Sequence, residues 1–463
     1  MRSATDRTSG GLLGLWRWPA LFVASGLGIV LFAAGGPGLW SYFLAVTLFM
    51  IAWVILLPRG WFRDSDRSTQ KIVTVFLVLR LVMPAIFSLV TENSEVLFGN
   101  GTDADFYDFS ARMISDQIDS GDPILPTPVV PGTGAIQWAL GAFYWLSSGE
   151  RLAASYLWSG LATIGMLLFW LATRSLIGRK QHLYAAAVLL LPSLLFWNAG
   201  VGKEALVTLG IGATIYGYWS ITGRAKVPAG IAYLAFGTIV IGAVRPHVGL
   251  VLLGSLGVGI LLGSSRFAKG GRSRWVFGLL IIGLLAVLIL PVTLRLLDAG
   301  AGESLLEASQ RRAEVATSQG GRSDFETQAV GGIGDIPRAV TTVLFRPFLW
   351  EVRTVPQLAA AIESTVIACF LIVSVWQVIV GRLSFRRTPL VVGATTYVIL
   401  FSAAIASYGN FGLLVRQRTQ VIAFLIFVLF SLQPRALNQA GLSVGSIRVS
   451  SKIRARSRSA ALR

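Results

Sequence analysis

Three aspartates lie close together in the segment GTDADFYDFSA, at Asp103, Asp105 and Asp108. A carboxylate on an accessible surface can act as a general base that removes the proton from an attacking hydroxyl group. Asp103 and Asp105 are both candidates for this role, and the residues alone do not choose between them. Together they form an Asp-x-Asp pattern that would suit a divalent metal, but so short a pattern is common by chance. We predict no required metal or other cofactor.

Eight further polar residues follow or precede apolar runs, where a charge is costly and tends to be paired or functional. We take them as candidate substrate-binding residues: Lys203, Glu204, Arg245, His247, Arg346, Glu351, Arg416 and Arg418. Arginine binds phosphate through paired hydrogen bonds and lysine binds it as a point charge. A single arginine at the end of an apolar run is often only an anchor whose charge reaches the membrane surface. The interpretation therefore rests on the whole set.

The segments between these polar residues, which must hold them in place, are long apolar runs. The chain has 463 residues, of which 54% are hydrophobic and 13% are charged, whereas soluble domains carry about 25% charged residues. Runs of about 17–25 apolar residues are long enough to cross a bilayer as helices. We therefore predict an all-α polytopic membrane bundle with twelve spans, at 19–35, 39–57, 72–90, 153–173, 183–197, 205–222, 228–244, 248–263, 276–293, 357–380, 390–407 and 419–433.

The apolar segment 134–147 is left out of that count because about 14 residues favour an interfacial or re-entrant helix over a span. With this choice the predicted cytoplasmic segments hold 26 of the 40 Lys and Arg residues but only three of the 22 acids. Basic residues gather in cytoplasmic loops, so we expect both termini in the cytoplasm of a plasma-membrane protein. Two long loops, 91–152 and 294–356, then face outward with the candidate residues.

The formal net charge of +18 does not indicate nucleic acid, because topology explains the basic loops. We expect a membrane domain over 1–433 and a basic cytoplasmic tail over 434–463, which is acid-free and predicted to be disordered. Membrane lipids are the expected surroundings. Two histidines exclude a histidine-rich metal site, and the one cysteine excludes an intramolecular disulfide.

Two charges lie inside predicted spans. Arg80 is in VFLVLRLVMPA and Glu363 is in AAAIESTV. Such residues usually face the interior of the bundle, and we expect Arg80 to find a partner there. A structural ion pair and a functional contact with a proton or substrate are both open, and the two residues need not contact each other.

A family resemblance covers roughly residues 70–222. The succession Asp105-x-Tyr107-x-x-x-Ala111, then GAFYWLSSGERLAASYLWSGLATIGMLLFWLATRSLIGRK and AAAVLLLPSLLFWNAGVGKEAL resembles GT-C-type integral membrane glycosyltransferases. More narrowly it is similar to the protein-mannosyltransferase-like and family 39-like members. RPH, FRPFLWE and NFGLLVRQR are similar to segments of polysaccharide-cluster membrane proteins. The acidic loop follows the third predicted span here, whereas that family usually has it after the first.

The resemblance implies a polyprenyl-phosphate sugar donor, a glycan, lipid or protein acceptor, and an active site on the extracytoplasmic face. It also implies a loop aspartate as base, which is Asp105 or Asp103 here. In our first hypothesis Lys203, Arg245, Arg416 and Arg418 bind the donor phosphate, and Arg346 and His247 assist. Two alternatives remain open at this point. One is an O-antigen-type polysaccharide polymerase or ligase, and the other is a lipid-linked sugar flippase or transporter, which would need polar residues spread through the depth of the bilayer.

Overall fold

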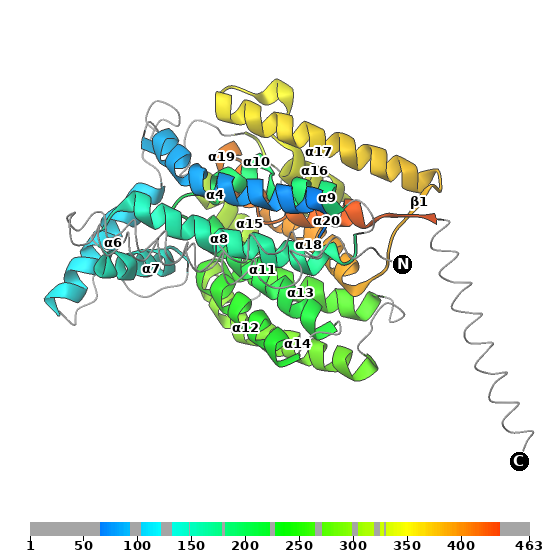
Figure 1. The fold of residues 1–463 in the computed structure, drawn as a ribbon, viewed down its shortest axis with the longest axis horizontal. Helices are drawn as coiled ribbons and strands as arrows, with labels where there is room; N and C mark the ends of the chain where they lie inside the picture. Colours follow the sequence, from blue (N-terminus) through cyan, green and yellow to red (C-terminus); the bar gives the residue numbers. More distant parts are fainter. Residues whose placement is uncertain are drawn as a thin grey trace, which may run out of the picture.

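The structure is a computed structural model, and it describes residues 65–92, 103–121, 132–147, 149–177, 181–222, 227–263, 271–298, 304–318, 325–327 and 330–435. The predicted spans 19–35 and 39–57, and all but the first two residues of the predicted tail, lie outside these ranges. The described chain is an all-α bundle, as the composition predicts (Figure 1). Its two strands, β1 (Leu383–Ser384) and β2 (Gln433–Pro434), have two residues each and pair antiparallel.

The helices follow one another in this order: α4 (Arg67–Glu92), α6 (Asp103–Ser120), α7 (Thr133–Leu146), α8 (Arg151–Arg174), α9 (Gln181–Leu189), α10 (Pro192–Trp197), α11 (Lys203–Thr222), α12 (Val227–Val244), α13 (Pro246–Leu262), α14 (Gly271–Leu297), α15 (Leu305–Ser318), α16 (Ile336–Phe345), α17 (Val355–Ile379), α18 (Pro389–Ile405), α19 (Phe411–Arg418) and α20 (Ile422–Ser431). Two short 3₁₀ turns, η3 (Ile333–Asp335) and η4 (Leu349–Glu351), flank α16.

The count of twelve spans is not supported. Five described helices, α4, α8, α12, α14 and α17, are long and apolar enough to cross a membrane, and α19 with α20 makes a sixth if that pair, bent by 48°, is one span. The predicted span 183–197 is broken into α9 and α10 because Pro192 starts a new helix. Hydropathy cannot separate a lipid-facing helix from a short apolar helix enclosed by others, such as the 17-residue α13 and α18.

The centre of the bundle is held by helices that approach one another at glycines. A Cβ atom on Gly212 of α11 would lie 1.9 Å from the carbonyl oxygen of Gly165 in α8, and one on Gly217 would lie 2.4 Å from the backbone nitrogen of Leu234 in α12. Small residues allow this close backbone packing in membrane helices. The contacts fix α11, whose first two residues are Lys203 and Glu204.

Arg80 has partners inside the bundle, as expected, but none of them is a carboxylate. Its guanidinium donates to the carbonyl oxygens of Ser159, Leu195 and Asn198 at 2.8–3.0 Å, and to the hydroxyl of Thr163 at 3.0 Å. Two of these carbonyls belong to the C-terminal end of α10, where a cation is favourable. Arg80 therefore anchors the short α10, which ends at Trp197 beside the candidate site.

The two ends of the bundle differ. Helices α6 and α7 pack on each other at one end, whereas β1 lies at the opposite end (Figure 1). The described residues of the predicted loop 91–152 are largely helical, and the predicted segment 134–147 corresponds to the 14-residue α7, which is not among the helices long enough to span. The second predicted loop, 294–356, contains α15 and α16.

Candidate functional site

Glu204 is the centre of a network of charged side chains. Its Oε1 atom lies 2.9 Å from Nη2 of Arg245 and 3.3 Å from Nε of Arg416, and its Oε2 accepts from Nη2 of Arg416 at 3.3 Å. Arg416 also donates from Nη1 to Oδ2 of Asp103 at 2.8 Å. We call Asp103, Glu204, Arg245 and Arg416 the ionic network.

The network runs from the interior to the surface. The side chains of Glu204 and Arg245 are only 2% and 8% exposed, Arg416 is 21% exposed, and Asp103 is 54% exposed. A buried charge needs a partner far more than an exposed one does. The buried pair of Glu204 and Arg245 therefore stabilises the fold, whereas the exposed Asp103 end of the network is accessible to a ligand.

Each network residue is positioned by a helix end. Arg245 lies between α12 and α13, where Pro246 starts the second helix. Glu204 lies in the first turn of α11, where a negative charge is favourable. Arg416 lies in the last turn of α19, where a cation is favourable, and Asn410 caps the start of that helix by accepting from the Leu413 N–H at 3.1 Å.

Four further side chains lie around the ionic network: Gln417, Trp197, Tyr107 and Lys203. Gln417 accepts from Nη1 of Arg245 at 2.9 Å. The guanidinium of Arg416 lies over the ring of Trp197 at 5.7 Å. Burial, followed by the negative charge of Asp103, raises the pKa of Tyr107, so its phenol stays protonated. Lys203 donates to the hydroxyl of Thr133 in α7 at 2.9 Å, and no carboxylate contact to it occurs within the described residues.

The other two aspartates of α6 have different partners. Asp105, 47% exposed, pairs with Arg151 of α8 at 2.5 Å. Asp108 pairs with Arg112 at 3.0 Å and accepts a hydrogen bond from Tyr144 of α7. Asp103 and Asp105 thus contact separate arginines, and in the described part of the chain no three His, Cys, Asp or Glu side chains come together as a metal-ligand group.

Arg346 and Glu351 lie together in a second place. Nε of Arg346 contacts the two carboxylate oxygens of Glu351 at 2.9 and 3.1 Å, and Nη2 also donates to Oε1. Burial acts to raise the pKa of Glu351, but hydrogen bonds from Arg346 and from the Phe348 N–H outweigh it, so its pKa lies below the usual value. The Glu351 carboxylate therefore stays ionised at neutral pH.

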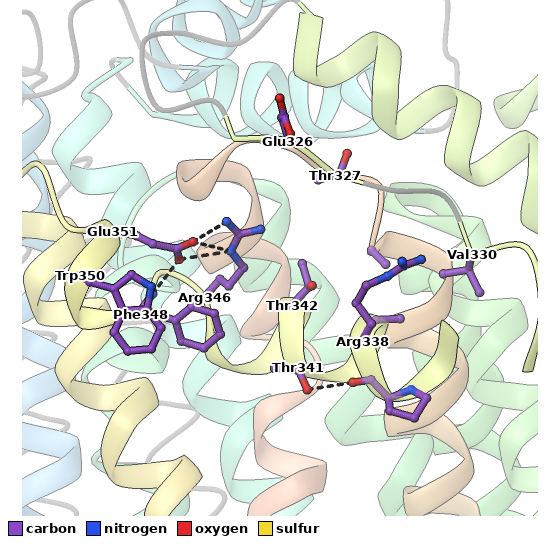
Figure 2. Close-up of a pocket in the computed structure, with 13 residues that line it drawn as sticks. Glu326, Thr327, Val330, Arg338, Thr341, Thr342, Arg346, Phe348, Trp350 and Glu351 are labelled. Atoms are coloured by element: carbon purple, nitrogen blue, oxygen red, sulfur yellow. Dashed lines mark hydrogen bonds and ion pairs between the residues drawn. The ribbon is translucent and has the colours of Figure 1, made fainter. Parts of the chain in front are cut away.

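This pair forms one wall of a cavity of about 800 Å³, which is shown in Figure 2. Its lining comes from Glu326, Thr327 and Val330, from α16 and η4 with the residues next to them, and from Ala406. The guanidinium of Arg346 lies 4.0 Å from the ring centroid of Phe325, which in turn stacks on Phe411 of α19 at 4.4 Å. Helix α19 therefore touches the surroundings of the cavity with its first residue and the ionic network with Arg416.

Arg418 and His247 are not members of the ionic network. Arg418, 1% exposed, lies 3.9 Å from Glu363 and donates to Ser364 and to the carbonyls of Leu344 and Arg346. Glu363 also accepts a hydrogen bond from the Ser193 N–H at 2.8 Å. His247 lies in the first turn of α13, and its buried Nδ1 atom has no hydrogen-bond partner among the described residues.

The structure therefore brings together four candidates, Asp103, Glu204, Arg245 and Arg416, and places Arg346 with Glu351 at a neighbouring cavity. Sequence reasoning missed Gln417 and Thr133, since an uncharged polar residue beside an apolar run carries no distinguishing signal. It also missed Arg151, which was read as a loop residue.

No family model matches this chain, and no curated protein or solved structure is significantly similar to it.

Proposed function

We propose that this chain is a membrane glycosyltransferase that transfers a sugar from a polyprenyl-phosphate donor to an acceptor on the extracytoplasmic face of the plasma membrane. The observation that carries the proposal is the contact from Asp103 through Arg416 to Glu204 and Arg245. It joins a solvent-accessible carboxylate to buried cations, which are the two kinds of group that such a transfer needs.

In this proposal the donor phosphate binds at the open end of the ionic network. With Lys203 included, three cations face two carboxylates there, so the region carries an excess positive charge. The phosphate takes the place of Asp103 on Arg416, since both ligands offer oxygen atoms to the same guanidinium. Glu204 and Gln417 hold the two arginines in position while this exchange occurs.

The exchange leaves the Asp103 carboxylate free to act as the base. The acceptor hydroxyl oxygen attacks the anomeric carbon, the bond from that carbon to the phosphate oxygen breaks, and Asp103 takes the hydroxyl proton. The bond electrons leave with polyprenyl phosphate, whose growing negative charge is stabilised by Arg416 and Lys203. Asp105 is the less favoured base because its partner, Arg151, is not a member of the ionic network.

A polysaccharide polymerase or ligase is the second candidate. The observation that favours it is the cavity of about 800 Å³ beside the network, which is larger than one sugar ring requires. In that case the donor would be a lipid-linked oligosaccharide instead of a single sugar on a lipid carrier.

The test is a glycan and lipid-linked-sugar profile of a deletion strain complemented with wild type, Asp103→Asn or Asp105→Asn. Both aspartates lie in the first turn of α6 and pair with an arginine, so Asp105→Asn is a matched control. We expect the deletion to lose a glycan or accumulate its precursor, and Asp103→Asn to fail where Asp105→Asn succeeds. An unchanged profile in the deletion strain would refute the proposal, provided that wild-type expression in the membrane is verified.

A further inference from the structure

The cavity beside Arg346 differs in charge from the ionic network. Two cations, Arg338 and Arg346, and two carboxylates, Glu326 and Glu351, line it, so its formal charges balance. Both arginines are already paired, Arg346 with Glu351 and Arg338 with Asp335 at 3.0 Å. A phosphate would therefore find no excess positive charge there, unlike at the network.

Its remaining recognition groups are hydrogen-bonding groups and aromatic faces. Arg346 donates through Nε and Nη2 to Glu351, and the third nitrogen of its guanidinium points into the cavity in Figure 2. Thr342 of α16 adds a hydroxyl group, whereas Thr341 and Thr327 donate theirs to backbone carbonyls and can still accept. A set of donors and acceptors held by paired charges suits a ligand that carries many hydroxyl groups and no net charge.

An aromatic stack forms one side of the cavity. The rings of Phe348 and Trp350 are stacked with centroids 4.8 Å apart, and Trp350 is 81% exposed. One face of the indole is therefore covered by Phe348, which leaves the other accessible. The electron-rich face of an aromatic ring favours contact with positively polarised hydrogens, such as the C–H groups on one face of a sugar ring.

We propose that this cavity binds the saccharide acceptor, as a neutral oligosaccharide chain whose terminal hydroxyl group reaches the ionic network. The role as acceptor site rests on the proposed transferase function, whereas the binding of a neutral saccharide does not. Helix α19 supports the arrangement, because Phe411 packs under Phe325 beside Arg346 while Arg416 of the same helix contacts Asp103. The acceptor and the donor phosphate then occupy opposite ends of one short helix.

The experiment measures saccharide binding by the purified full-length chain in lipid nanodiscs. An array of short neutral and acidic oligosaccharides identifies a ligand, and saturation-transfer NMR measures its affinity for each variant. We expect wild type to bind a neutral oligosaccharide, and Trp350→Ala to weaken binding by about tenfold. Trp350→Ala should fold normally because the residue is mostly exposed. Thr342→Val removes a hydroxyl group at nearly constant volume and tests the polar wall independently.

Trp376→Ala is the matched control, since Trp376 is also exposed, at 61%, but lies near the far end of α17. The proposal is overturned if wild type binds no oligosaccharide on the array. It is also overturned if Trp350→Ala and Thr342→Val bind as well as Trp376→Ala, which would make Trp350 an ordinary residue of the membrane interface. Competition by inorganic phosphate for the bound oligosaccharide would overturn it as well, because the cavity would then be an anion site.

These results separate the two proposals. Saccharide binding that depends on Trp350, together with an unchanged glycan profile in the deletion strain, refutes the transferase and keeps the binding site. A glycan defect that Asp103→Asn reproduces, with no saccharide binding at the cavity, refutes the site and keeps the transferase.

Discussion

Replacement of Glu204 by glutamine is expected to destabilise the folded chain by about 3–5 kcal/mol, the usual cost of leaving a buried charge without its partner. Glu204 is 2% exposed and contacts both Arg245 and Arg416. Arg416 keeps Asp103 as a charged partner in this variant. Arg245, which is 8% exposed, keeps only uncharged acceptors among the described residues, the amide oxygens of Gln417 and of the new glutamine. The cost therefore falls mainly on Arg245.

Asp103→Asn removes a carboxylate from the same arginine with a different expected result. Asp103 is 54% exposed and Arg416 is 21% exposed, and exposed ion pairs contribute about 0–1 kcal/mol. The two carboxylates that contact Arg416 should thus differ in their contribution to stability by several-fold. If Asp103 is the base, the less destabilising substitution is the one that abolishes transfer.

Both predictions are measured by equilibrium unfolding of the purified chain in mixed micelles with increasing SDS. The double variant Glu204→Gln with Arg245→Gln should be less destabilised than the sum of the two single variants, because each partner then leaves no charge behind. A Glu204→Gln variant within about 1 kcal/mol of wild type would refute the reasoning. So would an Asp103→Asn variant that is destabilised as much as Glu204→Gln.

Three further predictions concern activity, packing and pH. Asp103→Asn should lower the transfer rate by about 10²–10⁴-fold, the usual effect of losing a general base, whereas Asp105→Asn should change it little; initial rates with a lipid-linked donor measure this. Gly212→Ala should destabilise the fold by about 1–3 kcal/mol or more, because its Cβ would lie 1.9 Å from the backbone of α8. Gly254→Ala is the control, since a Cβ there would meet no atom within 4 Å, and it should be neutral or stabilising. Melting temperatures of the two variants test this difference. The folded-state pKa of Glu351 is lowered from 4.5, so its contribution is complete above that pH and disappears as the pH falls through the lower value. The difference in melting temperature between wild type and Glu351→Gln should therefore shrink in acid.

The sequence predicted the helical class and the unusual polar positions, because both depend on local composition. Lys203, Glu204, Arg245 and Arg416 were selected since each lies at the end of an apolar run, and the structure brings the last three together. Position at the end of an apolar run therefore identified these three residues, because charges at one end of several neighbouring helices must share a small volume.

The pairing of these residues was not predictable. Asp103 and Arg416 are 313 positions apart, and nothing in either segment specifies the other. The choice between Asp103 and Asp105 also depends on geometry. The two residues are two positions apart on α6, so their side chains leave the helix in directions about 200° apart around its axis. One of them therefore turns to α19 and the other to Arg151 in α8.

The described helices do not support twelve spans, because hydropathy in a single sequence cannot distinguish an apolar helix that faces protein from one that faces lipid. Most of α11 is buried by its neighbours, so its apolar surface faces protein. Arg418 illustrates the same limit for charges. It has the same sequence context as Arg416, two residues earlier, but is enclosed with Glu363 and Ser364 inside the bundle.

If both proposals hold, helix α19 also sets the spacing between the two substrates. Phe411 and Arg416 are five residues apart, which corresponds to about 7.5 Å along a helix axis. A single inserted residue would rotate Arg416 by about 100° relative to Phe411 and turn it away from Glu204. The helix thus fixes both the distance along its axis and the angle around its axis between Phe411 and Arg416. Variation in substrate length would have to be accommodated at the exposed Trp350 side of the cavity, and not between the cavity and the ionic network.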